Sequence, residues 1–575
     1  NSIVKNYLKN DQNGKLIVDN DFEIWDGFWN TGETYSHNQS LRVNYEIPFK
    51  LFPLIDFISS NYSYNGDFSW ERGSDAMAQV EDKLGNVLGR VNTIQNANTQ
   101  SLNTSLNLSR FYRNIGMIQK RKLNNTVQRI KNILIGFATG ISRFRVNYSE
   151  NNGQVLPGYT QSLGFLGTTK PSLGFVFGSQ SDIRFEAAKN GWLTEFPSFN
   201  EQYTKVHNNK FDLVAEISWF DDFSIDINAN KSYSENFFEN FSVINNEYNS
   251  LNPYKSGNFS ISTIMLKTSF EKSDQNNSET FGDFQKNRLI IAKRLALLNG
   301  NSNGQVDDAG FPQGYGKNNQ AVLIPSFIAA YSGSDPNKIS LNAIKNTPLP
   351  NWSIQYTGLI NMEFFKDRFK RFSVSHSYRS SYTLNSFKSN LEFDPNNNML
   401  TDQSGNFLNE ILYTNINLVE QFNPLIKLDM EFKNDIRFLL EMKKDRALSL
   451  SLDNNLLTET TGMDYSIGFG YRVKDLKFRN NIGGRQSVSS GDLNIKADLN
   501  YRDNITIIRN LDILDNKVTA GQSVWSFKIS ADYALSKSFN AVFFYDHLFS
   551  EFAISTAFPQ TTIRSGLTLR YNFGD

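Results

Sequence analysis

The sequence predicts an all-β fold, an antiparallel transmembrane β-barrel that is part of a very large barrel, with long loops containing short helices. Three observations predict it. Apolar and polar side chains alternate over segments of about 9–14 residues, whereas strands of soluble proteins usually run about 5–6. Aromatic residues make up 14% of the chain. The mean hydropathy of -0.44 fits strands that are apolar only at every second position.

Composition excludes several functional classes. The 575 residues contain 58 Lys+Arg and 58 Asp+Glu, so no net charge favours nucleic acid, and we expect no nucleic-acid partner. No cysteine is present, which excludes disulfides, thiol catalysis and cysteine metal sites. We find no apolar run of about 18 residues that would predict a membrane-spanning helix.

The first alternating segments lie at 61–71 and 211–230. In 61–71, Tyr62, Tyr64, Phe68 and Trp70 fall on one face, and the residues between them are polar. The second segment has an apolar face on both sides of a short turn at 220–222, as expected of a hairpin. Further segments of the same kind lie at 371–384, 463–472, 493–502 and 525–535. At about 9–14 residues they can cross a bilayer when tilted.

A soluble β-sandwich, propeller or solenoid also alternates with period two. Sandwich strands are usually shorter, and we find none of the fixed-period repeats that propellers and solenoids carry. A sandwich would bury its aromatic faces against a second sheet, whereas a barrel presents them to lipid and its polar face to a wet lumen. We therefore favour the membrane barrel.

The pattern divides the chain into six regions. We expect an amino-terminal lead-in at 1–40, barrel strands at 41–149 with a helical loop near 75–91, a long loop at 150–208, strands at 209–271, a long loop at 272–350 with a helix near 281–299, and strands at 351–575. The helix is predicted from one stripe, Phe281, Phe284, Arg288, Ile291, Leu295 and Leu298, with Gly300 as its stop. The long loops could cover the barrel mouth, enter the lumen, meet partner proteins or form a packed cap.

The last predicted strand resembles the β-signal of bacterial outer-membrane proteins, which the barrel-assembly machinery recognises. It combines a glycine with alternating hydrophobic and aromatic positions, namely Gly566, Leu569, Tyr571 and Phe573. An ordinary amphipathic edge strand would show the same alternation. Following a long series of similar strands, the pattern favours the assembly signal and a location in the bacterial outer membrane.

No motif in the sequence predicts catalysis. The four histidines, His37, His207, His376 and His547, are far apart and lack metal-ligand spacing. Nucleophile-elbow, phosphate-loop and dinucleotide motifs are missing from the sequence. The segment 299–310 faintly resembles a calcium loop but lacks the carboxylates that the ligand positions need. We therefore expect no enzyme activity, no metal and no cofactor.

Several separated motifs lie at 19–22, 64–73, 85–87, 92–96, 156–158, 177–180, 191–193, 323–331 and 348–352. Their most specific positions are Trp70, Arg72, Gly73, Gly178, Gln180, Trp192, Pro325, Phe327, Pro350, Asn351 and Trp352. Together, in this order, they resemble the SprA/Sov family, the outer-membrane translocon of the type IX secretion system, over roughly residues 15–360. Family members are much longer, so the resemblance implies a carboxy-terminal portion of the barrel.

The resemblance implies a translocon that passes folded cargo proteins through a wide polar lumen and that, in gliding bacteria, also serves gliding motility. Its implied partners are membrane lipid, the rest of the barrel, a smaller PorV-type barrel, a plug protein, periplasmic accessory proteins and the secreted cargo. Two other classes remain open: a self-contained porin or nutrient-receptor barrel, and a secreted soluble β-rich adhesin.

Overall fold

The computed structural model describes residues 2–4, 8–10, 16–18, 33–116, 139–163, 167–220, 222–300, 305–397, 399–482, 485–513, 515–536, 539–554 and 557–571. Most strands belong to one 18-stranded sheet. These strands are β1 (Ser2–Val4), β4 (Glu33–Ile47), β5 (Ile58–Arg72), β6 (Asn92–Asn107), β7 (Ile141–Tyr159), β8 (Gln202–Phe220), β9 (Phe223–Ile244), β10 (Glu247–Ser262), β11 (Asn351–Tyr356), β12 (Phe369–Ser389), β13 (Ile411–Tyr413), β14 (Asn415–Phe432), β15 (Ile436–Ser451), β16 (Leu456–Ile482), β17 (Arg485–Asn510), β18 (Asn516–Ser536), β19 (Phe539–Phe552) and β20 (Gln560–Tyr571). A separate hairpin pairs β2 (Leu8–Asn10) with β3 (Leu16–Val18).

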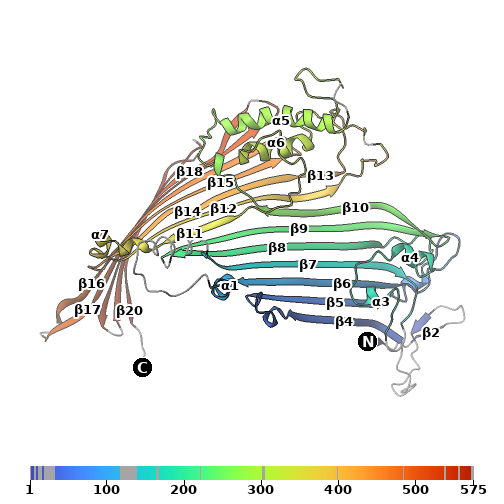
Figure 1. The fold of residues 1–575 in the computed structure, drawn as a ribbon, viewed down its shortest axis with the longest axis horizontal. Helices are drawn as coiled ribbons and strands as arrows, with labels where there is room; N and C mark the ends of the chain where they lie inside the picture. Colours follow the sequence, from blue (N-terminus) through green and yellow to red (C-terminus); the bar gives the residue numbers. More distant parts are fainter. Residues whose placement is uncertain are drawn as a thin grey trace, which may run out of the picture.

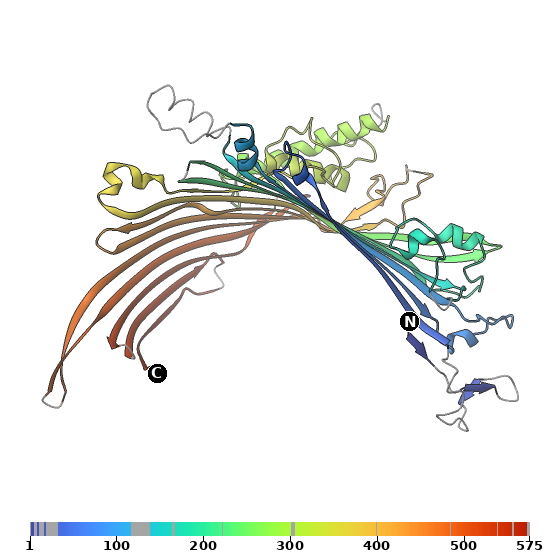
Figure 2. The ribbon, with the colours of Figure 1, turned by 60° about the horizontal axis from the view of Figure 1, so that its bottom comes forward.

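Every registered strand pair is antiparallel, and most join neighbours in sequence. The run begins with β1 on β4 and continues through β5 to β9. Strands β10 and β11 both lie between β9 and β12, and the run then continues through β14 to β20. The registers of the described residues do not join β20 to β4, and the two lie at opposite ends of an open arch (Figures 1 and 2).

This architecture confirms the predicted all-β antiparallel fold with short helices in long loops. The strands are longer than expected, reaching 27 residues in β16 and 26 in β17. The predicted loop at 150–208 is too long, since β7 continues to Tyr159 and β8 begins at Gln202. In parts of these strand ends, polar residues occupy both faces. The apolar–polar alternation from which the strands were predicted is therefore weak there.

Two other predicted boundaries also differ from the structure. Strand β4 begins at Glu33, inside the predicted lead-in, and β10 ends at Ser262, so the long loop starts earlier than 272. The helical loop predicted near 75–91 contains the 3-10 turn η2 (Met77–Gln79) and no α-helix. Gly85 and Gly89 adopt positive φ angles of 81° and 73°, which end any helical path there.

The helices all lie in connections between strands. They are η1 (Phe49–Leu51), α1 (Leu108–Asn114), α3 (Leu173–Val176), α4 (Arg184–Lys189), η3 (Leu266–Thr268), α5 (Glu279–Leu298), α6 (Gln320–Ser332), η4 (Gly358–Asn361) and α7 (Glu363–Lys366). Helix α5 matches the helix predicted near 281–299. The Ser278 side chain caps its start, and Gly300 follows its end at φ 71°. Among the described residues, no helix combines the length and apolarity needed to cross a membrane.

The sheet has two faces, which strand register distinguishes. We call them the outer face, on the convex side of the arch where α5 and α6 lie, and the inner face, on the concave side (Figure 2). Loops pack against the outer face at one end of the strands, in two places. Helices α5 and α6 form a core with Phe259, Tyr382, Leu418 and Leu448, and the α3–α4 segment forms another around Trp70.

Candidate functional site: a wall with two faces

Strand pairing places apolar side chains in continuous rows on the outer face. In one row Leu440, Ile467, Leu499 and Phe527 are successive partners across β15 to β18. The neighbouring row contains Glu441, Ser466, Asn500 and Ser526, which project to the inner face. The sequence prediction that these segments have one apolar and one polar face is confirmed by the register.

Much of the outer face is both apolar and exposed. Its exposed large side chains include Val43, Tyr45, Leu102, Tyr148, Ile426, Leu440, Tyr465, Ile467, Trp525, Phe527, Phe543, Ile563, Leu567 and Leu569. Val206 and Leu548 are exceptions that project to the inner face. A contiguous exposed apolar surface of this extent is rare on soluble monomers and typical of contact with lipid or with a partner.

Aromatic side chains gather in two groups on this face. Toward one end, Phe369, Phe432, Phe438 and Phe469 form a chain of ring contacts with centroids 4.4–6.0 Å apart. Toward the other end lie Trp352, Tyr378 and Phe422, at 4.5 and 5.0 Å. On β14 the span from Phe422 to Phe432 is about 26 Å at about 3.3 Å per residue, counted along the unbulged partner strand. With the strands tilted by about 35–45°, this length covers roughly 20 Å along the membrane normal, slightly less than the apolar band of about 25 Å that aromatic girdles flank in outer-membrane barrels.

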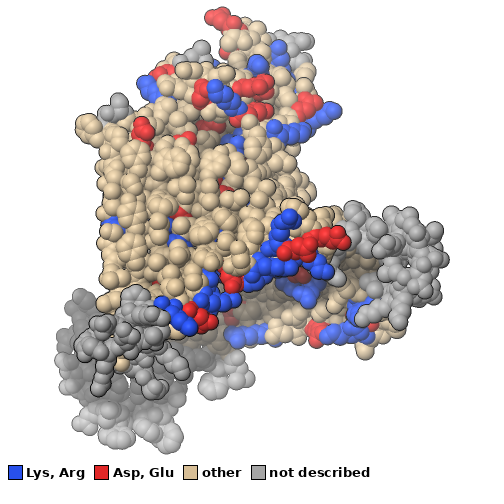
Figure 3. Space-filling model, turned by 90° about the vertical axis from the view of Figure 1, so that its left-hand side faces the viewer, with Lys and Arg blue, Asp and Glu red and all other residues tan. Residues whose placement is uncertain are grey.

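Charged side chains are sparse across a broad part of the surface. Figure 3 shows an area of almost uniformly uncharged side chains, with Lys, Arg, Asp and Glu gathered above and below it. A bilayer imposes such a distribution, because a charge in hydrocarbon is costly and a charge at either boundary remains hydrated.

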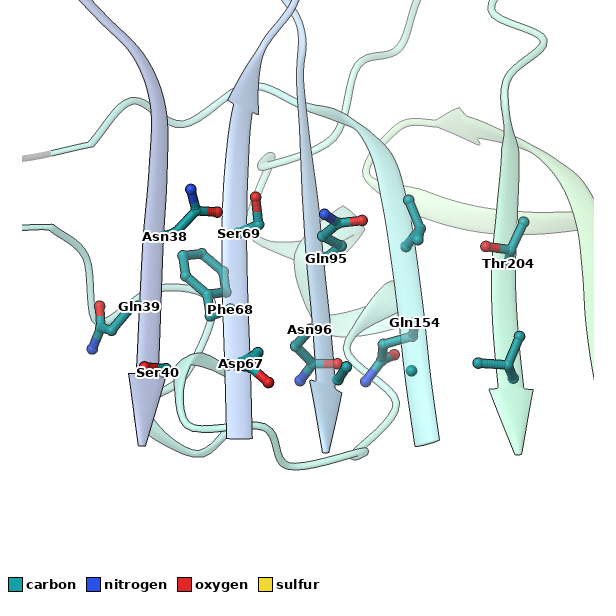
Figure 4. A pocket seen from close by; sticks show the side chains of 14 residues that line it. Asn38, Gln39, Ser40, Asp67, Phe68, Ser69, Gln95, Asn96, Gln154 and Thr204 are labelled. Atoms are coloured by element: carbon teal, nitrogen blue, oxygen red, sulfur yellow. The ribbon is translucent and has the colours of Figure 1, made fainter. Parts of the chain in front are cut away.

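The inner face is polar, with charges of both signs. Cross-strand ion pairs include Arg371–Asp429 at 3.0 Å and Arg502–Asp464 at 3.4 Å. A hollow of about 550 Å³ lies at the edge formed by β4 to β8, and Figure 4 shows polar side chains from five strands around it. Asn38, Ser69, Gln95 and Thr204 belong to one cross-strand row there. Such a surface stays wet without a strong preference for one sign of charge.

A strap crosses six strands where the outer apolar band ends. We give this name to residues 265–275, which follow β10. Strap residues donate hydrogen bonds to four of the strands: Met265 N to Tyr378 on β12, Ser269 to Glu420 on β14, Ser273 to Glu459 on β16, and Gln275 to Asn516 on β18. The other two strands donate to backbone carbonyls of the strap, through Arg446 on β15 and Arg509 on β17. The strap thereby separates the bare apolar band from the part of the outer face that α5 and α6 cover.

Two buried ion pairs lie beneath the strap. Arg446 donates to Glu420 at 3.1 Å, and Arg509 donates to Glu459 at 3.1 Å. All four side chains are almost fully buried, so each charge depends on its partner and on the strap. These four residues were not among those predicted from the sequence. Their signal was a charged residue at an apolar-face position of an otherwise alternating strand.

The structure brings several of the predicted family-motif positions together. Gly178 lies against Gly66 of β5, where a Cβ on Gly178 would come 2.8 Å from the Gly66 Cα. Gln180 donates to Asn96 at 3.1 Å, and Asn98 donates to the Gly178 carbonyl at 2.7 Å. The motifs at 64–73, 92–96 and 177–180 therefore form one docking contact between a loop and the outer face.

The neighbouring motif positions support the same contact. Trp70 is buried and donates to the Gln161 carbonyl at 3.2 Å. Arg72 pairs with Asp75 at 3.6 Å, and a Cβ on Gly73 would come 1.9 Å from the Val91 carbonyl oxygen. The Lys170 ammonium lies 5.5 Å from the Trp192 ring.

The remaining motif positions lie elsewhere on the wall, by which we mean the 18-stranded sheet and the loops packed on it. Pro325 and Phe327 are buried within α6. Asn351 and Trp352 directly follow Pro350 in the sequence. Asn351 accepts a hydrogen bond from the backbone N–H of Ser380, and the Trp352 ring stacks on Tyr378. Gly566, Leu569 and Tyr571 lie on β20, and Phe573 lies outside the described residues. In the described part of the chain no group of three or more His, Asp or Glu could hold a metal ion.

Comparisons with known proteins add no family. No family model matches the sequence, and neither does any curated protein. Among solved structures, the chain is similar to the β domain of the Bordetella autotransporter BrkA, at 7% identity over 65% of this chain and 92% of that chain, with a TM-score of 0.18.

Two transport proteins are similar at the same low level. The siderophore receptor PiuA from Acinetobacter baumannii shares 8% identity over 90% of this chain and 62% of its own, with a TM-score of 0.25. The RagAB peptide transporter shares 7% over 88% of this chain and 49% of its own, also at 0.25. The chain thus spans less than two thirds of either. Such TM-scores are too low to show that the whole folds correspond.

Proposed function

We propose that this chain forms part of the wall of a protein-conducting translocon in the bacterial outer membrane, of the type IX secretion class. The observation that carries the proposal is the wall itself: an antiparallel sheet with an apolar outer band between aromatic groups, and a polar inner face. The first property suits lipid, and the second suits an aqueous passage.

The openness of the sheet supports a large barrel. Among the described residues no register joins β4 to β20, so in this proposal further strands complete the ring, from another part of the polypeptide or another chain. A barrel with this many strands and more encloses a lumen wide enough for polypeptide cargo. A self-contained porin or nutrient receptor would instead close upon itself.

The lengths of the connections support an orientation. At one end of the strands, 19 to 88 residues separate β5 from β6, β7 from β8, β10 from β11 and β12 from β13, although only two separate β9 from β10. At the other end, two or three residues separate β8 from β9, β14 from β15, β16 from β17 and β18 from β19, and the longest separations are 12 residues between β11 and β12 and 33 between β6 and β7. Outer-membrane barrels have long extracellular loops and short periplasmic turns. The strap and the helical caps would then face the outside of the cell.

The type IX assignment rests on the ordered motifs, three of which, at 64–73, 92–96 and 177–180, meet in the contact around Gly66 and Gly178. Under this proposal the partners are a PorV-type barrel, a plug protein, periplasmic accessory proteins and secreted cargo, and gliding adhesins would be part of that cargo.

A crosslinking experiment on neighbouring residues tests the proposal. A photoreactive side chain replaces Asn500 on the inner face or, as the matched control, Leu499 on the outer face, in cells with active secretion. We expect adducts with secreted proteins from position 500 and none from position 499. Absence of protein adducts at position 500 during active secretion, or equal yields from both positions, would contradict a cargo-conducting lumen.

A further inference from the structure

Two connections at the short-turn end fold together into one small unit. The connection at 48–57 contains η1, and the adjacent connection contains α1. Asp56 joins them, because it pairs with Arg110 at 2.8 Å and accepts from Asn114 at 2.7 Å. The rings of Phe57 and Phe111 also meet, with centroids 4.7 Å apart.

Several apolar side chains of this unit are exposed on its surface. Leu51 is 76% exposed and Leu54 82%, and Phe52 between them is also exposed. A series of backbone bonds from Leu51, Phe52, Ile55 and Ile58 holds the connection in tight turns. The apolar side chains therefore project from an ordered scaffold.

A second connection at the same end repeats this chemistry. Phe365 in α7 packs on the outer-face residues Phe369 and Phe372, with ring centroids 5.8 and 4.8 Å apart. Phe364 instead is 60% exposed, and the guanidinium of Arg368 lies 4.1 Å from its ring. Figure 2 shows α1 and α7 both on the convex side of the arch, where the apolar band lies.

The charges around both units suit an anionic surface. Residues 46–57 together with 108–114, and residues 361–370, contain six basic residues and four acidic ones, namely Lys50, Arg110, Arg113, Lys366, Arg368 and Lys370 against Glu46, Asp56, Glu363 and Asp367. Short amphipathic elements with exposed aromatic and leucine side chains beside Lys and Arg bind the headgroup boundary of bilayers.

We propose that these two units, the 48–57/α1 unit and α7, are interfacial anchors that insert Leu51, Phe52, Leu54 and Phe364 into the phospholipid leaflet at the short-turn end. Their basic side chains bind the phosphates of the same lipids. The occupant is lipid because the units continue the apolar band on its convex side and carry a net positive charge. The inference rests on the proposed membrane location and adds to it a defined depth for the short-turn end.

These 575 residues contain no cysteine, so a single introduced cysteine is the one labelling site within them. The full protein carries one spin label, at Phe52→Cys or Phe364→Cys, in vesicles of phosphatidylethanolamine and phosphatidylglycerol. Collision rates with oxygen, which concentrates in lipid, and with a nickel chelate, which stays in water, report the surroundings of each label. Leu298→Cys is the control, because Leu298 is an apolar residue at the end of α5 that is more exposed, at 73%, than Phe52 at 57% and Phe364 at 60%. Ile467→Cys serves as the band reference, and Ser63→Cys as the inner-face reference.

We expect oxygen-favoured collisions at positions 52, 364 and 467, and nickel-favoured collisions at 298 and 63. Nickel-favoured collisions at 52 and 364 with an oxygen-favoured label at 467 would overturn the anchors and leave the membrane wall intact. Shielding of 52 and 364 from both reagents would overturn them in favour of a protein partner. A nickel-favoured label at 467 would refute the membrane wall itself.

Discussion

Replacing Ile467 with lysine probes the outer face at the centre of its apolar band. Ile467 lies between Leu440 and Leu499 in the register, four residues from Met463 and four from Tyr471 along β16. Its side chain is therefore far from both aromatic groups, which mark the boundaries of the apolar band. A lysine at the midplane on the lipid face of a barrel costs about 2–4 kcal/mol. At about 1.4 kcal/mol per factor of ten, the ratio of folded to unfolded protein falls roughly 30-fold to 1000-fold.

The neighbouring residue supplies the control. Ser466 projects to the inner face beside Glu441 and Asn500, and Ser466→Lys keeps its ammonium in water near a carboxylate, so we expect little change. Guanidinium unfolding of the completed barrel in lipid vesicles, followed by tryptophan fluorescence, measures both variants. Ile227 on β9 pairs with Trp352 of one aromatic group, near the boundary, where a lysine costs only about 0–1 kcal/mol, so the decisive comparison is the one at positions 466 and 467. Equal costs on the two faces would refute the assignment of lipid and lumen.

Three further predictions concern the covered part of the outer face. Arg446→Met leaves Glu420 buried and unpaired and should cost about 3–5 kcal/mol in denaturant unfolding, while adding Glu420→Leu should recover most of it; no recovery would contradict the pairing. Gly178→Ala should open the 160–201 segment to limited proteolysis, because the φ angle of Gly178 is 94° and a Cβ there would clash with Gly66. Gly85→Ala is the control, because Gly85 has a similar φ angle of 81° but open space around it. This control should lose only the stability that a left-handed alanine costs, about 1–2 kcal/mol. Burial lowers the pKa of Lys345 to about 8, below its unfolded value of about 10.4, so the folded state binds fewer protons in between and stability should rise from about pH 8 to about pH 10. Guanidinium unfolding at both ends of this pH window, with Lys345→Met as control, checks the last prediction, and an equal pH dependence in the variant would contradict it.

Alternation within a strand was enough to predict its two faces. Ile467, Leu499 and Phe527 fall in one row because strand side chains alternate strictly and antiparallel pairing preserves that order. The buried stripe of α5 was predicted through Phe281, Phe284 and Ile291. Leu298 at its end was predicted in the stripe but is exposed, because α5 ends there and nothing in the described chain covers it.

Contacts between distant segments could not be predicted from local pattern. Ser269 meets Glu420, and Gly178 meets Gly66, across more than a hundred residues. Local spacing also predicted a helical turn near 75–91, where the positive φ angles of Gly85 and Gly89 impose irregular turns. Closure of the sheet depends on what pairs with β4 and β20, and alternation within those strands does not encode it.

Electron cryo-microscopy of the purified full-length protein in lipid nanodiscs tests the central claim most directly. The predicted result is a wall whose convex face meets lipid between the two aromatic groups, with further strands beside β4 and β20 enclosing a wide aqueous lumen. A second protein layer packed over Tyr465, Ile467 and Trp525, with no lipid against them, would contradict it.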